Sequence, residues 1–345
     1  MKITIRPADL DADRLQMIQL FRQHLNADFD ERRFNWMYLG GPHGKAVAWV
    51  STTDENKELM GAATAFPRLL RADGKETQGY VLGDFCIHPS ARTLGPALQL
   101  QRACLEGISA RLGTLWYDFP SDAMTAVYRR LGINSPARLV RLSKPLRADR
   151  ALATKFKSRA VKSLMGVAAN TALRASDSIR RRGGASQITL HQGPCGEEFS
   201  RLAQQTQNPR EICVLNTAGY LNWRFLSHPF QQFDILTACE GDALCGYVVL
   251  AREGDDARIY SLRSLDDETA RDLILSAIDA MRSVRVVTIS ASIIDEDPRT
   301  RIFKKLGFRP RESRPVVFPE PAASRVESKD KRKNHWHLMD GDRDG

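Results

Sequence analysis

The stretch "HPSARTLGPALQLQRACLEG", residues 88–107, places a proline, an arginine and a glycine directly before a run of helical character. An apolar strand pattern ends at His88, Pro89 interrupts it, and apolar residues from Leu94 onward recur at helical spacing. The residues between them therefore form a turn from a strand into a helix. The first N–H groups of a helix lack partners within the helix and lie at the positive end of its dipole, so this turn predicts an anion site.

The residue types in this turn suit an anion. Arg92 adds a full positive charge, Gly95 allows the backbone to approach a ligand closely, and Ala97 leaves room for the helix to pack. Pro96 has no N–H to offer. The candidate amide donors are those of Thr93, Leu94, Gly95 and Ala97. The alternative is a structural turn that binds nothing.

Length and composition describe a folded protein of about two domains. The chain has 345 residues, of which 42% are hydrophobic and 27% are charged. No apolar run reaches the roughly 18 residues of a membrane span, and "MKITIRPADL" lacks a signal-peptide core, so we expect a cytoplasmic protein. The six cysteines show no C-x-x-C spacing, which predicts neither a zinc site nor a disulfide framework. We predict no metal site.

The net charge of +10 is concentrated in one segment. Residues 141–183 contain twelve Lys/Arg and two Asp, so the rest of the chain is neutral. One basic segment between balanced halves indicates a connector, and we do not expect nucleic acid as a partner. Apolar residues at intervals of three and four predict one long helix within a basic linker at 146–186. This helix could also bind an acidic partner, either an acyl carrier protein or an anionic substrate.

The two halves of the chain repeat one another. "NWMYLGGP" begins at Asn35 and "NWRFLSHP" at Asn222, and "AVYRRLGI" around Tyr128 matches "RIFKKLGF" around Phe303. Strand and helix patterns alternate in both halves, which predicts an α/β fold (α+β with mixed sheets) built from two copies of one unit. We expect the tryptophans of the two Asn-Trp motifs, Trp36 and Trp223, to have a packing role. We predict domains at 1–145 and 187–318, and a polar tail at 319–345 that either docks on the body or extends from it.

Together, these motifs resemble the GCN5-related N-acetyltransferase (GNAT) superfamily. The coenzyme A loop of that family reads R/Q-x-x-G-x-G/A, which matches Arg92–Ala97 here, after the strand "FCIHP" and before a Tyr-x-x-x-Gly helix. The resemblance implies two tandem GNAT-like domains joined by the basic helix. It further implies that acetyl-coenzyme A, or another acyl-coenzyme A, donates an acyl group to a primary amine of a small molecule such as an amino sugar or amino acid.

The resemblance also assigns roles to residues. Tyr128 takes the place of the acid that protonates the departing thiolate, and the backbone N–H of Ile87 is the candidate oxyanion donor. Strand alternation puts Asp84 on one face with Cys86 and His88, and Asp84 is the candidate base. The residues predicted to bind the cofactor are Phe85, Ile87, Arg92, Thr93, Leu94, Gly95 and Ala97.

The second copy departs from the motif. Its corresponding helix begins with Asp266, Asp267 and Glu268, whose charges would repel a diphosphate, and Phe303 replaces the tyrosine. We therefore expect only the N-terminal half to bind coenzyme A, while the C-terminal half shapes the acceptor pocket or supports the fold. Two alternatives stay open: an aminoacyl-tRNA-dependent transferase of the peptidoglycan type, and a non-catalytic binding or scaffold protein with a vestigial pocket.

Overall fold

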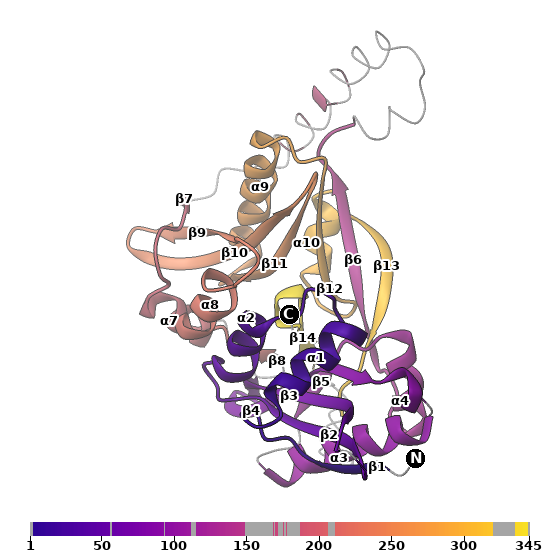
Figure 1. Ribbon diagram of the computed structural model, residues 1–345. Helices are drawn as coiled ribbons and strands as arrows, with labels where there is room; N and C mark the ends of the chain where they lie inside the picture. Colours follow the sequence, from indigo (N-terminus) through magenta and orange to yellow (C-terminus); the bar gives the residue numbers. More distant parts are fainter. Residues whose placement is uncertain are drawn as a thin grey trace, which may run out of the picture.

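The computed structural model describes residues 3–55, 57–92, 94–111, 115–148, 187–205, 211–319 and 335–343, together with 168, 170, 171, 175 and 177. Within these residues the strands form two mixed seven-stranded sheets that lie against each other (Figure 1). No helix in this part of the chain combines the length and apolar character needed to cross a membrane.

The first half alternates strands and helices, as the sequence pattern predicts. Helix α3 begins at Leu94, where the apolar spacing predicts a helix start. The elements are β1 (Ile3–Pro7), α1 (Arg14–His24), α2 (Glu31–Phe34), the π-helical turn η1 (Asn35–Leu39), β2 (Val47–Thr53), β3 (Leu59–Ala72), β4 (Lys75–Ile87), the 3₁₀ turn η2 (Pro89–Ala91), α3 (Leu94–Arg111), β5 (Trp116–Asp118), α4 (Asp122–Arg130) and β6 (Ala137–Pro145).

The second half contains a similar series, followed by a short C-terminal segment. Its elements are β7 (Gln187–Leu190), α7 (Glu197–Gln205), β8 (Glu211–Val214), α8 (Ala218–Leu221), the π-helical turn η3 (Asn222–Leu226), β9 (Asp234–Glu240), β10 (Ala243–Glu253), β11 (Asp256–Ser264), α9 (Asp267–Ser283), β12 (Thr288–Ile294), α10 (Thr300–Lys305), β13 (Arg309–Val316), β14 (His335–His337) and η5 (Asp340–Asp342).

The two halves exchange strands. The first sheet runs β1-β2-β3-β4-β5 and also holds β8 and β14, whereas the second runs β13-β6-β12-β11-β10-β9-β7. Thus β6 pairs with β12 and β13 in the second sheet, although it precedes the domain boundary that we predicted at residue 145. Side-chain alternation indicates which face of a strand is buried and says nothing about its neighbour in the sheet, so this exchange could not be predicted from the sequence pattern.

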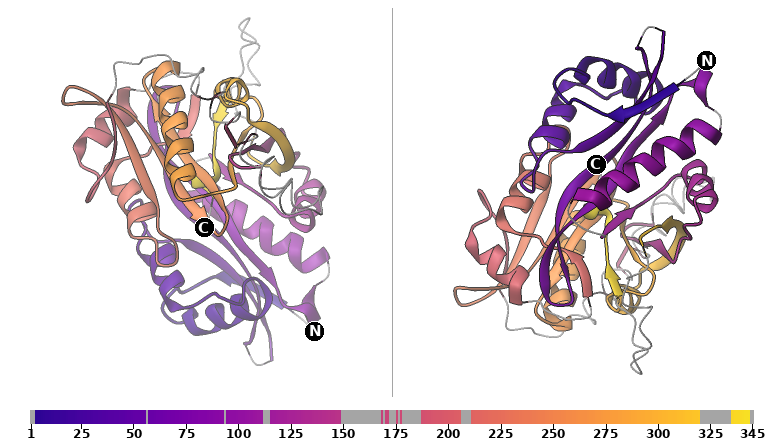
Figure 2. Two further views of the ribbon diagram at one scale, coloured as in Figure 1. Left: turned by 90° about the horizontal axis from the view of Figure 1, so that it is seen from above. Right: turned by 90° about the horizontal axis from the view of Figure 1, so that it is seen from below.

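Helices cover both faces of each sheet (Figure 2). In the first half α3 and α4 bury one face, and α1 with η1 buries the other. In the second half α9 and α10 cover one face, and α7 with α8 covers the other. A parallel pair of strands lies in each sheet, β4 with β5 and β11 with β12. The predicted mixed α/β class is therefore confirmed.

The repeated Asn-Trp motifs meet where the halves join. Trp36 and Trp223 stack with ring centroids 5.1 Å apart, and each is about 8% exposed. The Trp36 indole N–H donates to the Trp223 carbonyl at 2.9 Å, and the Trp223 indole donates to the Trp36 carbonyl at 3.0 Å. Both motifs form π-helical turns. The two tryptophans pack as expected, and the reciprocal bonds give the junction a local two-fold arrangement.

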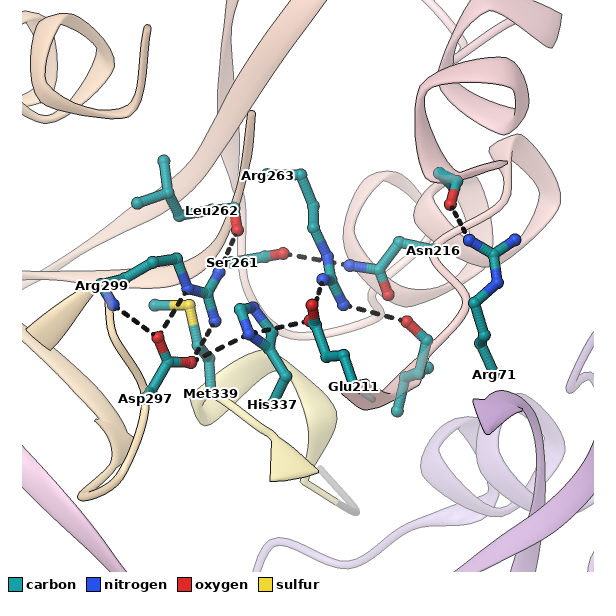
Figure 3. A network of polar contacts seen from close by, with 12 residues as sticks. Arg71, Glu211, Asn216, Ser261, Leu262, Arg263, Asp297, Arg299, His337 and Met339 are labelled. Atoms are coloured by element: carbon teal, nitrogen blue, oxygen red, sulfur yellow. Dashed lines mark hydrogen bonds and ion pairs between the residues drawn. The ribbon is translucent and has the colours of Figure 1, made fainter. Parts of the chain in front are cut away.

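The C-terminal segment docks between the two sheets (Figure 1). Strand β14 pairs in parallel with β8, and the side chains of Trp336, Leu338 and Met339 are buried. Figure 3 shows His337 held between two carboxylates: its Nδ1 lies 2.9 Å from Glu211 Oε1 and 3.0 Å from Asp297 Oδ2. Residues 336–342 are thus buried against the body of the protein.

The predicted long basic helix lies outside the described residues, apart from the five single positions above. The binding of an acidic partner to this helix therefore stays a prediction. One of the five, Asp177, is buried and forms ion pairs with Lys144 at 2.6 Å and Arg282 at 2.5 Å.

Candidate active site

A cavity of about 520 Å³ lies where β4 and β5 separate. The strands pair only over Tyr80–Leu82 and Trp116–Asp118. Beyond that point β4 continues to Ile87, whereas the chain after β5 turns at Pro120 into α4. The walls of the cavity come from the end of β4, the first turns of α3 and α4, and the end of α1. We call it the strand-gap cavity.

A β-bulge in β4 lies at the edge of this cavity. The register with β3 shifts between Ala62 and Thr64, so that Asp84 and Phe85 together oppose a single residue of β3. Asp84 adopts φ of 47°, in the left-handed region. That conformation costs a non-glycine residue on the order of 1–3 kcal/mol, persists only where the surroundings hold it, and is enriched at functional sites. A bulge bends and twists its strand, which gives a physical cause for the separation from β5.

Two polar side chains hold the buried Asp84 carboxylate. The Tyr38 hydroxyl donates to Asp84 Oδ2 at 2.9 Å, and Arg33 Nη2 lies 3.7 Å from Oδ1. The same hydroxyl lies 3.1 Å from Thr64 Oγ1. Burial, and then the charge of Asp84, raises the pKa of Tyr38 well above its ordinary value, so Tyr38 keeps its proton and remains a donor.

The three residues predicted to share a strand face all contact the α1 side of β4. Asp84 does so through Tyr38, the Cys86 thiol lies 4.0 Å from a carbonyl oxygen of α1, and the His88 ring lies 4.8 Å from that of His24. Of the three, Asp84 and Cys86 line the cavity.

The backbone of Ile87 faces the gap between the strands. The His88 N–H donates to the carbonyl of Met60 on β3 at 2.7 Å. Successive residues of an antiparallel strand direct their N–H groups to opposite sides, so the Ile87 N–H points away from β3 toward the β5 side. Consistently, the Ile87 carbonyl accepts from Arg92 Nη2 at 3.4 Å. The structure places the predicted oxyanion donor at the strand-gap cavity.

The start of α3 forms one wall of the cavity. Arg92 and Ala97 line it, and Phe85 lines it from β4. A Cβ added to Gly95 would meet no atom within 4 Å, so the backbone is open to a ligand there. The sequence of the first turn contains no acidic residue. Two of the predicted cofactor-binding positions, Thr93 and the side chain of Leu94, lie outside the described residues.

Tyr128 lies behind the cavity wall. It is fully buried, its hydroxyl donates to Asp118 Oδ2 at 2.6 Å, and it accepts from Gln101 Nε2 at 3.1 Å. Burial, and then the charge of Asp118, raises the pKa of Tyr128 well above its ordinary value. Asp118 and Gln101 line the cavity in its place.

Sequence reasoning did not single out four residues of this site. Asp118 and Gln101 carry the contacts of Tyr128, and Arg343 reaches the cavity from the C-terminal segment. His24, the last residue of α1, also lines the cavity. Burial, and then the charges of His88 and Arg92, lowers the pKa of His24 below 6.5, so this imidazole is neutral at pH 7. A polar residue closing the apolar strand "LWYDF" was the available signal for Asp118.

At the equivalent position in the second half, acidic side chains occupy the start of the helix. The Asp266 carboxylate caps α9 by accepting from the Thr269 N–H at 2.7 Å, and Asp267 and Glu268 follow in the first turn.

In the described part of the chain, no group of three or more His, Cys, Asp or Glu side chains could hold a metal ion.

No protein-family model and no curated protein matches the sequence. Solved structures match over 92% of the chain. A GCN5-related N-acetyltransferase from Anabaena variabilis ATCC 29413 aligns with a TM-score of 0.66 at 15% identity, and 72% of its chain is covered. The chain has the fold of the GCN5-related N-acetyltransferases.

Two further matches extend the range of proteins that share this GNAT fold. A conserved Enterococcus faecalis V583 protein of unknown function, described as a probable N-acyltransferase, has a TM-score of 0.67 at 12% identity, with 72% of its chain covered. Saccharomyces cerevisiae N-myristoyltransferase with bound myristoyl-CoA has a TM-score of 0.55 at 13% identity, with 78% covered. At these identities the likeness establishes the GNAT fold alone.

Proposed function

We propose that this chain is an acyl-coenzyme A-dependent N-acyltransferase and that its cofactor site is the strand-gap cavity. One observation carries the proposal: the separated strands, the strained bulge residue Asp84 and the acid-free start of α3 meet at a single cavity. The fold neighbours, which include N-acetyltransferases and an N-myristoyltransferase, support an acyl donor and an amine acceptor.

The residues present fit the diphosphate of coenzyme A. The amides at the start of α3, including those of Gly95 and Ala97, would hold the phosphates together with the Arg92 side chain. The co-substrate supplies an acyl thioester when bound. Phe85 would contribute apolar surface from β4.

Acyl transfer to an amine needs a base for the amine proton and a donor for the carbonyl oxygen. The Ile87 N–H would stabilise the negative charge that develops on that oxygen. Asp84 is our candidate base, and its position on a strained bulge that lines the cavity supports it. His24 is a second candidate, because it lines the same cavity and is neutral at pH 7.

For Tyr128 we propose a positioning role in place of direct acid catalysis. Its hydroxyl proton is already donated to Asp118, and its ring is closed off from the cavity. By holding the Asp118 carboxylate at the end of β5, Tyr128 would shape the wall of the cavity beside the departing thiol.

We further propose that the second half is a degenerate copy, with units close to 1–145 and 187–318 that exchange strands. The acidic cap of α9 supports the loss of cofactor binding there. We also propose that the protein acts in the cytoplasm, because its proposed donor is acyl-coenzyme A.

Thermal stability measured with acetyl-coenzyme A tests the proposal. A ligand at one hundred times its Kd adds about 2.7 kcal/mol to the free energy of unfolding, which raises Tm. Arg92→Glu should abolish this shift, because it places a negative charge against the phosphates. Arg102→Glu reverses the charge of another exposed arginine, farther along α3; it is the matched control and should retain the shift.

The outcomes separate the alternatives. Stabilisation together with thiol release in the presence of a panel of amines supports the enzyme. Stabilisation without turnover on any amine supports the scaffold protein. Absence of any shift with wild-type protein contradicts coenzyme A binding and favours the aminoacyl-tRNA-dependent alternative. An unchanged shift in Arg92→Glu contradicts the assigned site, because the cofactor then binds elsewhere.

A further inference from the structure

A second and larger cavity, of about 760 Å³, lies at the junction of the two halves. Its walls come from the segment between α1 and α2, from α2, from the chain after η3, from β10 and β11, and from the C-terminal segment. We call it the arginine cavity. It exists only because both halves and the docked C-terminal segment contribute to it.

This cavity is rich in arginine. Among the described residues that line it, six arginines face three carboxylates. Two of these arginines also pair with carboxylates outside the lining, Arg32 with Asp30 at 2.8 Å and Arg33 with Asp84 at 3.7 Å, so the formal excess is one positive charge. The arginines are Arg32, Arg33, Arg224, Arg252, Arg258 and Arg343, and the carboxylates are Asp28, Glu253 and Asp340. A concave surface of one sign concentrates the field within it and attracts ligands of the opposite sign.

The contacts of individual arginines leave the cavity cationic. Arg258 shares the carboxylates of Glu253 at 3.0 Å and Asp340 at 3.8 Å, and its guanidinium lies 5.7 Å from the centroid of Tyr260. The guanidinium of Arg252 donates to a backbone carbonyl, so its charge is not neutralised by that contact.

The arginines of this cavity also affect the pKa of a neighbouring imidazole. His228 lines the cavity, and burial followed by the charges of Arg224 and Arg33 lowers the pKa of His228 to about 4. This imidazole is therefore neutral at pH 7, and the cationic character of the cavity comes from guanidinium groups that stay charged.

The arginine cavity adjoins the strand-gap cavity. Arg33 lines the first and lies 3.7 Å from Asp84, which lines the second. Arg343 lines both. At the end of α1 the wall passes from Leu25 in one cavity to Asn26 in the other. A molecule in the arginine cavity can therefore present one end to Asp84.

Building on the proposed function, we infer that the arginine cavity binds the acceptor, and that the acceptor amine also carries an anionic group, a carboxylate or a phosphate. The anionic group lies among the arginines and the amine is directed toward Asp84. This selects acidic amino acids and phosphorylated amino sugars over polyamines, whose positive charges the cavity repels.

Titration calorimetry with simple anions tests the cavity directly. With coenzyme A saturating, so that the first site is filled, inorganic pyrophosphate or succinate should bind to wild-type protein. Arg258→Gln should weaken that binding by about tenfold or more, because a charge-assisted hydrogen bond is lost. Arg252→Gln alters an exposed arginine of the same cavity and should weaken binding as well.

The matched control is Arg141→Gln, which removes a similarly exposed arginine that pairs with Glu312 outside both cavities. It should bind both anions as wild type does. Binding of pyrophosphate alone identifies a phosphate-bearing acceptor, and binding of succinate alone a carboxylate-bearing one. If neither anion binds wild-type protein, or if both cavity variants bind as tightly as the control, the inference is overturned.

Turnover distinguishes failure of this inference from failure of the proposed function. Thiol release from acetyl-coenzyme A should be at least about tenfold more efficient with glucosamine 6-phosphate or glutamate than with glucosamine or spermidine. Equal rates with neutral or cationic amines would refute the inference and leave the acyltransferase intact. If acetyl-coenzyme A neither stabilises the protein nor is consumed, the proposed function fails, and pyrophosphate titration without coenzyme A still decides whether the cavity binds anions.

Discussion

Glu211 links the C-terminal segment to the body of the protein, and Glu211→Gln should weaken that link in a pH-dependent way. The Glu211 carboxylate lies 2.9 Å from His337 Nδ1 and 3.2 Å from Arg263 Nη1 (Figure 3). Its side chain is 19% exposed. Glutamine keeps the shape of the side chain and removes its charge.

The magnitude follows from the pKa. Burial by itself would raise the pKa of Glu211, but the charge and hydrogen bond of His337, with the charge of Arg263, lower it from 4.5 to about 2. Because the folded pKa lies below the unfolded one, the carboxylate stabilises the protein above pH 4.5, and this stability is lost as the pH falls toward 2. The difference corresponds to about 3 kcal/mol at pH 7 and about half of that at pH 3.

Urea unfolding at pH 7 and pH 3, followed by circular dichroism and by tryptophan fluorescence, measures this free energy. Trp336 lies in the docked segment, so fluorescence also reports its release. The control is Glu312→Gln, which breaks an exposed ion pair with Arg141 and should cost about 0–1 kcal/mol at either pH. Equal stability of Glu211→Gln and wild type at pH 7, or a loss of the same size at both pH values, would refute the reasoning.

Three further predictions concern packing and the site. Tyr128→Phe removes the hydroxyl that holds the carboxylate at the end of β5, and we expect kcat to fall while the Kd for acetyl-coenzyme A, measured by calorimetry, stays unchanged. Gly107→Ala should destabilise the protein by about 1–3 kcal/mol in urea unfolding, because the new Cβ would lie 1.8 Å from Trp49 Cζ2; wild-type stability would contradict the close approach of α3 and β2. Trp223→Ala should cost about 3–5 kcal/mol by the same assay, since it removes a buried ring and its hydrogen bond across the junction of the halves; a loss below about 1 kcal/mol would show that the junction contributes little.

Local sequence determined the elements and the polarity of the two helix starts. The strand that ends at Ile87, one residue before the predicted end, and the helix that begins at Leu94 follow from apolar periodicity and from a proline between them, which are properties of neighbouring residues. The acidic start of α9 is equally local, since Asp266 caps its own helix. The 187-residue offset between Asn35 and Asn222 also identified the two turns that meet at the junction of the halves.

Only the tertiary structure decided how those elements share strands and cavities. The bulge at Asp84 depends on register with β3, and the position of β6 depends on pairing with strands more than a hundred residues away. Tyr128 occupies the position that the family resemblance assigns to the catalytic acid. It packs behind Asp118, however, and does not line the cavity. The arginine cavity combines side chains from both halves and from Arg343 near the chain end, so its charge is a sum over distant segments that no local window of sequence contains. Periodicity fixes the buried face of each element, whereas the choice of neighbours is made by the packed core as a whole.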